Sequence, residues 1–213
     1  MAIEVEAKFL AVDDDPLNAL AGAATIGPAE LGTPTTVGEI DVYLDTPDGR
    51  LAAARWACRL RDRGAGFRIS LKGPAVMDTD VAWLHRRPEV EGPATASFDP
   101  ADWPPSEARN RLLAMAAGGP LVERFRLLQH RTERAVTLEG RTVGTLSLDR
   151  ATVARAGELL GVLHVVELEL VAGEDPAVTP ILPRLADALG ELEGLEADRR
   201  TKLEHAEELL DRR

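Results

Sequence analysis

The stretch Ile3-Glu4-Val5-Glu6-Ala7-Lys8-Phe9 alternates strictly between apolar and charged residues. This period of two is typical of a β-strand, because successive side chains of a strand point to opposite faces of its sheet. The apolar residues would share one face, and Glu4, Glu6 and Lys8 would share the other. Because a strand with such a charged face most often turns it to solvent, the stretch by itself predicts a strand and not a site.

The same alternation of charges recurs further along the chain. Acids cluster on the first and the late strands and bases on the middle ones, whereas a face built for solubility would mix the two signs. If the strands close into a barrel with these faces inward, its lumen has an acidic wall and a basic wall. Charges are costly in a dry core, so the pattern predicts a wet tunnel for a polyanion that divalent cations bridge to the carboxylates. The alternating residues are Arg59 and Arg61; Arg68, Ser70 and Lys72; Arg87, Glu89 and Glu91; and Glu167 and Glu169.

Periodicity and turn residues divide the rest of the chain into strands and a few helices. Most of the strands are joined by short loops, which favours an antiparallel sheet or barrel. We therefore expect one α+β domain over residues 1–213, with C-terminal helices packed on it at about 176–211. The predicted strands are 33–44, 57–63, 66–73, 80–91, 121–138 as one strand or two, 142–149, 151–156 and 162–171. The predicted helices are 17–24, a short turn at 51–54, 106–117, 176–189 and 195–210.

Composition excludes several classes of protein. The 213 residues include 36 acidic and 25 basic side chains, a net charge of −11, which argues against binding nucleic acid along an open surface. A single cysteine, Cys58, allows no intrachain disulfide and no cysteine-rich zinc motif. No apolar run approaches the roughly 20 residues of a membrane-spanning helix, and no signal peptide is visible. We therefore expect a cytoplasmic protein that binds no membrane.

Taken in order, these residues resemble the CYTH family, also called triphosphate tunnel metalloenzymes. The resemblance runs from residue 4 to about residue 210 and is strongest to CYTH domains that bacteria fuse to a helical CHAD domain, so a bacterial stand-alone CYTH protein is expected. Two features depart from the family pattern: Arg134 stands where an aromatic is common, and His130 or Arg126 could replace Arg131 if the strand register shifts. The matching segments are Glu4-Val5-Glu6-Ala7-Lys8, Tyr43-Leu44-Asp45-Thr46-Pro47, Arg59-Leu60-Arg61, Ile69-Ser70-Leu71-Lys72-Gly73, Arg87-Pro88-Glu89, Arg131, Ser147-Leu148-Asp149, Glu167-Leu168-Glu169 and Thr201-Lys202.

The resemblance implies a closed eight-stranded antiparallel β-barrel with flanking helices, in which a tunnel holds a triphosphate. Substrate-binding cations would be Lys8, Arg59, Arg61, Lys72, Arg87, Arg131 and Lys202. Ligands of Mg²⁺ or Mn²⁺ would be Glu4, Glu6, Glu89, Asp149, Glu167 and Glu169, an all-oxygen set that suits hard ions. Glu4, Glu6 and Lys8 would be catalytic. Two simpler interpretations stay open: Asp149 could cap a turn, and Arg61 could pair with a surface acid.

The function that the resemblance implies is metal-dependent hydrolysis of a triphosphate. The substrate would be inorganic triphosphate, thiamine triphosphate or a nucleoside triphosphate, and metal-activated water would release phosphate. One alternative is an adenylate cyclase of class IV type, which makes cyclic AMP from ATP. Another is a non-catalytic polyphosphate-binding module. The expected partner is a small triphosphate-bearing molecule, and a homodimer through the last helix stays open.

Overall fold

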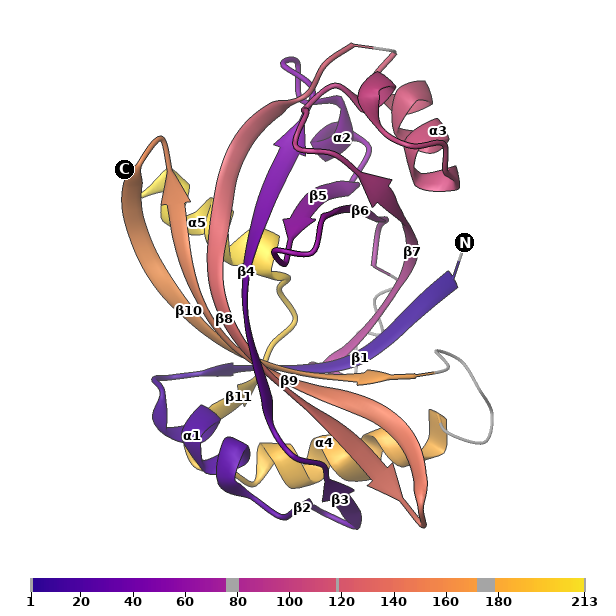
Figure 1. Cartoon of the computed structure of the whole chain (residues 1–213). Helices are drawn as coiled ribbons and strands as arrows, with labels where there is room; N and C mark the ends of the chain where they lie inside the picture. The colour runs from indigo at the N-terminus through magenta and orange to yellow at the C-terminus, as the bar shows by residue number, and fades with distance from the viewer. Residues whose placement is uncertain (1, 76–80, 118, 172–178, 213) are drawn as a thin grey trace.

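The computed structural model describes residues 2–75, 81–117, 119–171 and 179–212. Eight strands pair in the order β8-β4-β5-β6-β7-β1-β10-β9, and a further pairing of β8 with β9 closes them into a barrel (Figure 1). All neighbouring strands of this ring are antiparallel, which confirms the predicted fold class. The barrel strands are β1 (Ala2–Ala11), β4 (Thr35–Asp45), β5 (Ala57–Asp62), β6 (Phe67–Lys72), β7 (Leu84–Ala94), β8 (Val122–Leu138), β9 (Arg141–Arg155) and β10 (Glu158–Leu170).

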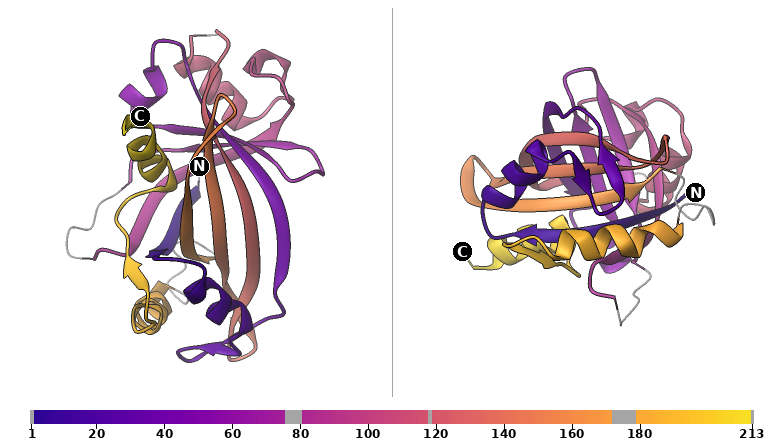
Figure 2. Two further views of the ribbon diagram at one scale, coloured as in Figure 1. Left: turned by 90° about the vertical axis from the view of Figure 1, so that its left-hand side faces the viewer. Right: turned by 90° about the horizontal axis from the view of Figure 1, so that it is seen from below.

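Helices and short strands cover the outside of this barrel. The helices are α1 (Asp15–Gly22), α2 (Arg50–Ala53), α3 (Glu107–Met115), α4 (Leu182–Gly190) and α5 (Lys202–Asp211), with 3₁₀ turns η1 (Pro100–Asp102) and η2 (Thr179–Ile181). The short strands are β2 (Thr25–Ile26), β3 (Ala29–Leu31) and β11 (Leu195–Ala197). Helices α1 and α4 lie on one side of the barrel and α2 and α3 on the opposite side (Figure 1), and the view from below shows α4 running along β1 (Figure 2).

Apolar residues form two clusters on the outer faces of the barrel. One joins alternate residues of β1, β9 and β10 to α1 and α4, with Phe9, Leu146 and Leu185 buried in it. The other joins the outer faces of β5, β6 and β7 to α3, with Leu60 and Leu112 at its centre. Because side chains alternate along a strand, covering the apolar residues from outside turns the charged ones inward.

A third apolar cluster closes one end of the lumen. The inward-facing residues of β4 and β8 become apolar there, and the rings of Tyr43 and Phe125 stack with their centroids 4.7 Å apart. Ala206 of α5 is buried in the same cluster, so the last helix packs against the inner end of the tunnel. Thr201 caps this helix, and Thr201 and Glu204 form a capping box. The first residue of α5, Lys202, is thereby brought to the end of the charged section.

Several predicted elements differ from the observed ones. Residues 142–149 and 151–156 belong to one continuous strand, β9, and 121–138 is one strand, because the two pair with each other along almost their whole length. Residues 195–210 are not one helix: Leu195–Ala197 pairs with β1, and α5 starts only at Lys202. Pairing with an open edge there overrides the helical pattern. The predicted starts at Asp80 and Pro176 lie outside the described residues. None of the described helices has the length and apolarity needed to cross a membrane.

Arg134, which departs from the family pattern, lies outside the tunnel and joins three elements. Its guanidinium donates to the carbonyls of Ala23 at 2.6 Å and Gly32 at 2.7 Å, and also to those of Leu20, Ala21 and Leu31. The side chain is buried, and these carbonyls include the last ones of α1, which have no partner within the helix. Arg134 therefore has a structural role.

Replacing Arg134 by lysine is expected to lower the free energy of unfolding by about 2 kcal/mol, because an ammonium cannot reproduce the planar fork of donors. Thermal unfolding would show this as a fall in Tm of roughly 4–8 °C. The matched control is Arg126→Lys on the outer face of β8, whose exposed pair with Glu123 should contribute little. Equal Tm values for the two variants would contradict the structural role.

Candidate functional site

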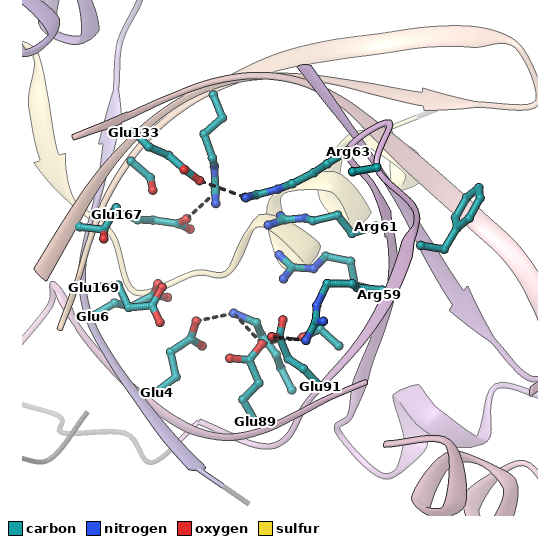
Figure 3. A pocket seen from close by; sticks show the side chains of 18 of the residues that line it. Glu4, Glu6, Arg59, Arg61, Arg63, Glu89, Glu91, Glu133, Glu167 and Glu169 are labelled. Atoms are coloured by element: carbon teal, nitrogen blue, oxygen red, sulfur yellow. Dashed lines mark hydrogen bonds and ion pairs between the residues drawn. The ribbon is translucent and has the colours of Figure 1, made fainter. Parts of the chain in front are cut away.

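The charged section of the lumen is a cavity of about 640 Å³. Its walls carry opposite charges: Glu6, Glu167 and Glu169 lie across the lumen from Arg59, Arg61 and Arg63 (Figure 3). The charged and hydroxyl residues that line it are Glu4, Glu6, Arg59, Arg61, Arg63, Arg68, Ser70, Lys72, Glu89, Glu91, Arg131, Glu133, Thr145, Ser147, Glu167 and Glu169. The two-residue period of the strands therefore predicted the inward faces correctly.

The acidic wall is formed where β1 pairs with β10. Glu6 is directly opposite Glu169 in the strand register, and Lys8 is opposite Glu167. Burial, together with the negative charges of Glu4 and Glu167, raises the pKa of Glu6 to about 7. Burial and the charge of Glu4 also raise the pKa of Glu169. At Glu6 and Glu169, burial and the neighbouring carboxylates thus outweigh the nearby cations.

Two cations of the neighbouring strands contact this wall. Lys72 on β6 hydrogen-bonds to Glu4, and Arg87 Nε on β7 donates to Glu4 Oε2 at 2.9 Å. Burial alone would raise the pKa of Glu4, but Lys72 and Arg87 outweigh it and lower that pKa to about 2. Arg87 Nη2 also reaches Glu6 Oε1 at 3.2 Å. Glu4 is therefore well neutralised and Glu6 is not.

The basic wall is formed by β5. Arg61 donates through Nε and Nη2 to the two oxygens of Asp41, at 2.6 and 2.7 Å. Arg59 is only 13% exposed, and its Nη1 lies 3.6 Å from Asp41 Oδ2. Within the part of the chain that the structure describes, Arg59 Nε is buried without a hydrogen-bond partner. An unpaired buried guanidinium N–H is costly, and an anion in the adjacent cavity would satisfy it.

A third cluster of charges lies at the inner end of the cavity. Arg131 donates from Nε and Nη2 to the two oxygens of Asp149, both at 2.6 Å. Lys202 Nζ lies 2.5 Å from Asp149 Oδ2 and 2.7 Å from Glu167 Oε2. Burial would raise the pKa of Asp149, but Lys202 and Arg131 outweigh it and lower that pKa. Asp149 lies within β9, so it does not cap a turn.

Comparison with known proteins agrees with this architecture. A family model of the CYTH domain matches residues 2–209. The chain belongs to the CYTH family. As expected from the sequence, the match covers nearly the whole chain. The inward-facing Glu4, Glu6 and Lys8 lie at the start of the matched region.

Three solved structures share the fold at low sequence identity. The first is a protein from Hippeastrum, proposed to be an adenylyl cyclase and described as having a dominant triphosphatase activity; it is 22% identical, covers 96% of this chain and 95% of its own, and has a TM-score of 0.67. A proposed adenylate cyclase from Bacillus halodurans is 18% identical over 96% and 98% of the two chains, with a TM-score of 0.57. The Mimivirus capping enzyme triphosphatase is 10% identical over 89% and 90%, with a TM-score of 0.52. These likenesses show a shared fold.

The CYTH tunnel brings together most of the predicted site residues, and three others, Arg87, Asp149 and Lys202, border the cavity through ion pairs. Arg87 contacts it through Glu4 and Glu6, and Asp149 and Lys202 contact it through Arg131 and Glu167. Lys8 instead donates to the carbonyl of Arg200, and its Nζ lies 3.5 Å from Asp198 Oδ2. Absent from the cavity lining are Lys8, Arg87, Asp149 and Lys202. Arg131 points inward while Arg126 pairs with Glu123 outside, so Arg131 is the arginine of this strand that lines the cavity.

Sequence reasoning missed Arg63 and Glu133, which line the cavity, and three further inward-facing residues of this CYTH domain. Glu39 and Asp41 precede Tyr43 at intervals of two on β4, and Gln129 precedes Arg131 on β8. All three are buried. The alternation that predicted the inward face of β1 also runs through Glu39, Asp41 and Tyr43. Because the segment around Tyr43 was interpreted as supporting the fold, its two acidic residues were not considered as part of a site.

The donor set of the tunnel fits a hard divalent cation. Among the described residues no three acidic, histidine or cysteine side chains already converge as a metal site. The acidic wall nevertheless offers carboxylate oxygens, the ligands that Mg²⁺ and Mn²⁺ prefer. The raised pKa values of Glu6 and Glu169 show that a positive charge beside them would be stabilising.

Proposed function

We propose that this CYTH protein is a metal-dependent triphosphatase. Its substrate would be inorganic triphosphate or another short triphosphate, such as thiamine triphosphate or a nucleoside triphosphate. The observation that carries the proposal is one cavity with an unsatisfied donor on one wall, Arg59 Nε, and carboxylates short of positive charge on the other, Glu6 and Glu169. A phosphate chain bridged to those carboxylates by a divalent cation would satisfy both walls.

The cations that line the cavity are suited to hold the phosphate chain. Arg59 has a donor without a partner among the described residues, and Arg61 and Arg131 would donate their remaining N–H groups to further phosphate oxygens along the chain. Lys72 would contribute a point charge. Arg87 and Lys202 would act from behind Glu4 and Glu167 unless those ion pairs open, and Lys8 would first have to leave the carbonyl of Arg200.

The acidic wall would hold the metal. Glu4, Glu6, Glu89, Glu167 and Glu169 would supply oxygen ligands to Mg²⁺ or Mn²⁺; Asp149 stays a predicted ligand, although both its oxygens accept from Arg131 and Lys202. When bound, the cation would neutralise phosphate charge and lower the pKa of attacking water. Glu4 and Glu6 act in this scheme by providing the negative charge that fixes the cation opposite Arg59.

The chain itself supplies no covalent nucleophile in this scheme. Ser70 Oγ donates to Glu89 Oε1 at 2.5 Å, and the Cys58 thiol is buried in the outer apolar cluster, where burial raises its pKa. Phosphoryl transfer to water requires positioning and charge neutralisation more than covalent chemistry, so a tunnel of fixed charges is sufficient.

A phosphate-release assay tests this function. We expect purified protein to release phosphate from tripolyphosphate, thiamine triphosphate or ATP in Mg²⁺ or Mn²⁺ and not in EDTA. No release from any of these compounds with Mg²⁺, Mn²⁺ or Ca²⁺ would contradict the proposal. Cyclic AMP formed from ATP would identify the cyclase, and tight binding without turnover would identify a binding module.

A further inference from the structure

Two buried carboxylates behind the basic wall have no part in the reaction scheme above. Glu39 and Asp41 project from β4 toward the lumen side, but they do not line the cavity, and their side chains are 0% and 1% exposed. The strand register places Asp41 directly opposite Arg61 of β5. Charged groups buried this deeply are destabilising unless they are paired, so their partners indicate what they do.

The partners of this carboxylate pair are the arginines of the basic wall. Asp41 accepts two hydrogen bonds from Arg61 and lies 3.6 Å from Arg59 Nη1. Glu39 lies 2.9 Å from Arg61 Nη2 and accepts from Arg63 Nε at 2.8 Å. The two carboxylates therefore contact three consecutive inward-facing arginines along β5 and its end.

Gln129 holds the two carboxylates side by side. Its Nε2 donates to Glu39 Oε1 at 2.9 Å and to Asp41 Oδ2 at 2.8 Å. Burial would raise the pKa of Asp41, but Arg59 and Arg61 outweigh it and keep that pKa well below its usual range. The pair is therefore anchored by an amide and by arginines.

This arrangement occupies one edge of each guanidinium and leaves another edge free. Arg61 uses Nε and Nη2 for the carboxylates, so its Nη1 remains, and Arg59 Nε is without a partner among the described residues. Both arginines line the cavity. Lys72 and Arg87 differ, because their partner Glu4 is itself a proposed metal ligand and their ion pairs would change when a cation binds.

We propose that Glu39 and Asp41 are positioning residues that hold Arg59, Arg61 and Arg63 as a preformed site for a phosphate chain, which binds there without a metal. This inference rests on the proposed function. Side chains that are already immobilised lose little rotamer freedom when the ligand binds. The metal is then required for turnover at the acidic wall and not for the first capture of the substrate.

The two carboxylates also have an electrostatic effect on phosphate binding, and it is opposite in direction to the positioning effect. Two negative charges behind the arginines also repel phosphate, so a role limited to neutralisation would make their removal strengthen binding. Positioning predicts the reverse. The wall still offers donors to an anion while its geometry is held, because Arg59 Nε has no partner among the described residues and the bonds of Arg61 to Asp41 use only Nε and Nη2.

The decisive variant is Asp41→Asn, measured by titration calorimetry with tripolyphosphate in EDTA. We expect its Kd to rise about tenfold or more, because the charged hydrogen bonds that orient Arg61 are weakened. Its KM should rise in parallel, and kcat in Mg²⁺ should stay within about twofold because the acidic wall is intact. The control is Glu123→Gln, which frees Arg126 from the same kind of paired contact on the outer face and should leave Kd unchanged.

A second variant covers the case in which Asp41→Asn does not fold. Gln129→Met removes the bridging amide but no charge, and it should weaken metal-free binding in the same direction by a smaller factor. The double variant Asp41→Asn/Arg61→Gln should lose less binding than the sum of the two single losses, since Asp41 acts in part through Arg61 and in part through Arg59. Additive losses would indicate a general structural role and overturn the inference.

The remaining outcomes separate this inference from the proposed function. Unchanged or tighter tripolyphosphate binding by Asp41→Asn or Gln129→Met overturns the positioning role. A wild-type protein that hydrolyses triphosphate with Mg²⁺ but binds none in EDTA overturns the preformed site and leaves the triphosphatase function intact. A wild-type protein that neither binds nor hydrolyses any triphosphate overturns both.

Discussion

Glu6→Gln is expected to lower the rate of triphosphate hydrolysis by about 10²- to 10³-fold while the barrel stays folded. Losing one preorganised charged group at a reaction centre has effects of this size, because the group acts on charge that develops in the transition state. Glu6 is less neutralised than Glu4 and Glu167, each of which contacts two cations, since its one hydrogen bond to a cation among the described residues comes from Arg87 at 3.2 Å. Phosphate release in Mg²⁺ or Mn²⁺ measures the loss directly.

The same variant should be more stable than the wild type when no metal is present. The fold raises the pKa of Glu6 from 4.5 to about 7, so the stability that its protonated form contributes is complete below pH 4.5 and is lost as the pH rises to 7. Glutamine cannot ionise. At pH 8 in EDTA the free energy of unfolding of Glu6→Gln should therefore exceed that of the wild type by about 3 kcal/mol.

Calorimetric unfolding with and without Mg²⁺ checks both the metal-ligand role of Glu6 and the effect of its ionisation on stability. The wild type should gain Tm when the ion is added, and Glu6→Gln should gain much less, because a ligand that binds the native state raises its stability. Glu196→Gln, on the exposed face of β11, is the control and should match the wild type in rate and in Tm. A Glu6→Gln protein with normal turnover would show that the acidic wall is not the metal site.

Asp149→Ala is expected to destabilise the protein by about 4 kcal/mol, which is roughly 8–16 °C in Tm. The carboxylate is fully buried, with Arg131 on both oxygens and Lys202 on one. Its removal leaves two buried cations that share Glu167, with Glu39 a further 3.6 Å partner of Arg131, and an undercompensated buried charge is far more costly than a missing pair. Thermal and urea unfolding would measure the loss.

The matched control for Asp149→Ala is Asp48→Ala. Asp48 also pairs with an arginine, Arg50, at 2.7 Å, but both side chains are more than half exposed, so we expect less than about 0.5 kcal/mol. Asp149→Ala with a Tm near the wild-type value would mean that Arg131 and Lys202 find other partners. If the Asp149→Ala protein were stable but hydrolysed triphosphate more slowly, the loss would have to come from the metal-ligand role predicted for Asp149.

Local periodicity accounts for the success of the sequence reasoning. Alternation along β1, β5, β6 and β10 placed Glu4, Arg59, Lys72 and Glu167 on inward faces before any strand order was known. A period of two decides which face of a strand a side chain occupies, and covering the apolar face decides which face is inward. The acidic and basic walls, on which the proposed class of ligand rests, could therefore be inferred from the chain alone.

Tertiary structure alone decided which charges meet. Asp149 looked equally suited to a turn or a metal, and only the pairing of β8 with β9 places it against Arg131. The segment at 195–197 became a strand because β1 offered it an edge, and this let α5 bring Lys202 to Glu167. The buried pair Glu39 and Asp41 acquired a role only when β5 closed beside β4. Sequence periodicity specifies the direction of a side chain along its own strand, whereas the identity of its partner depends on barrel closure, which joins residues far apart in the chain.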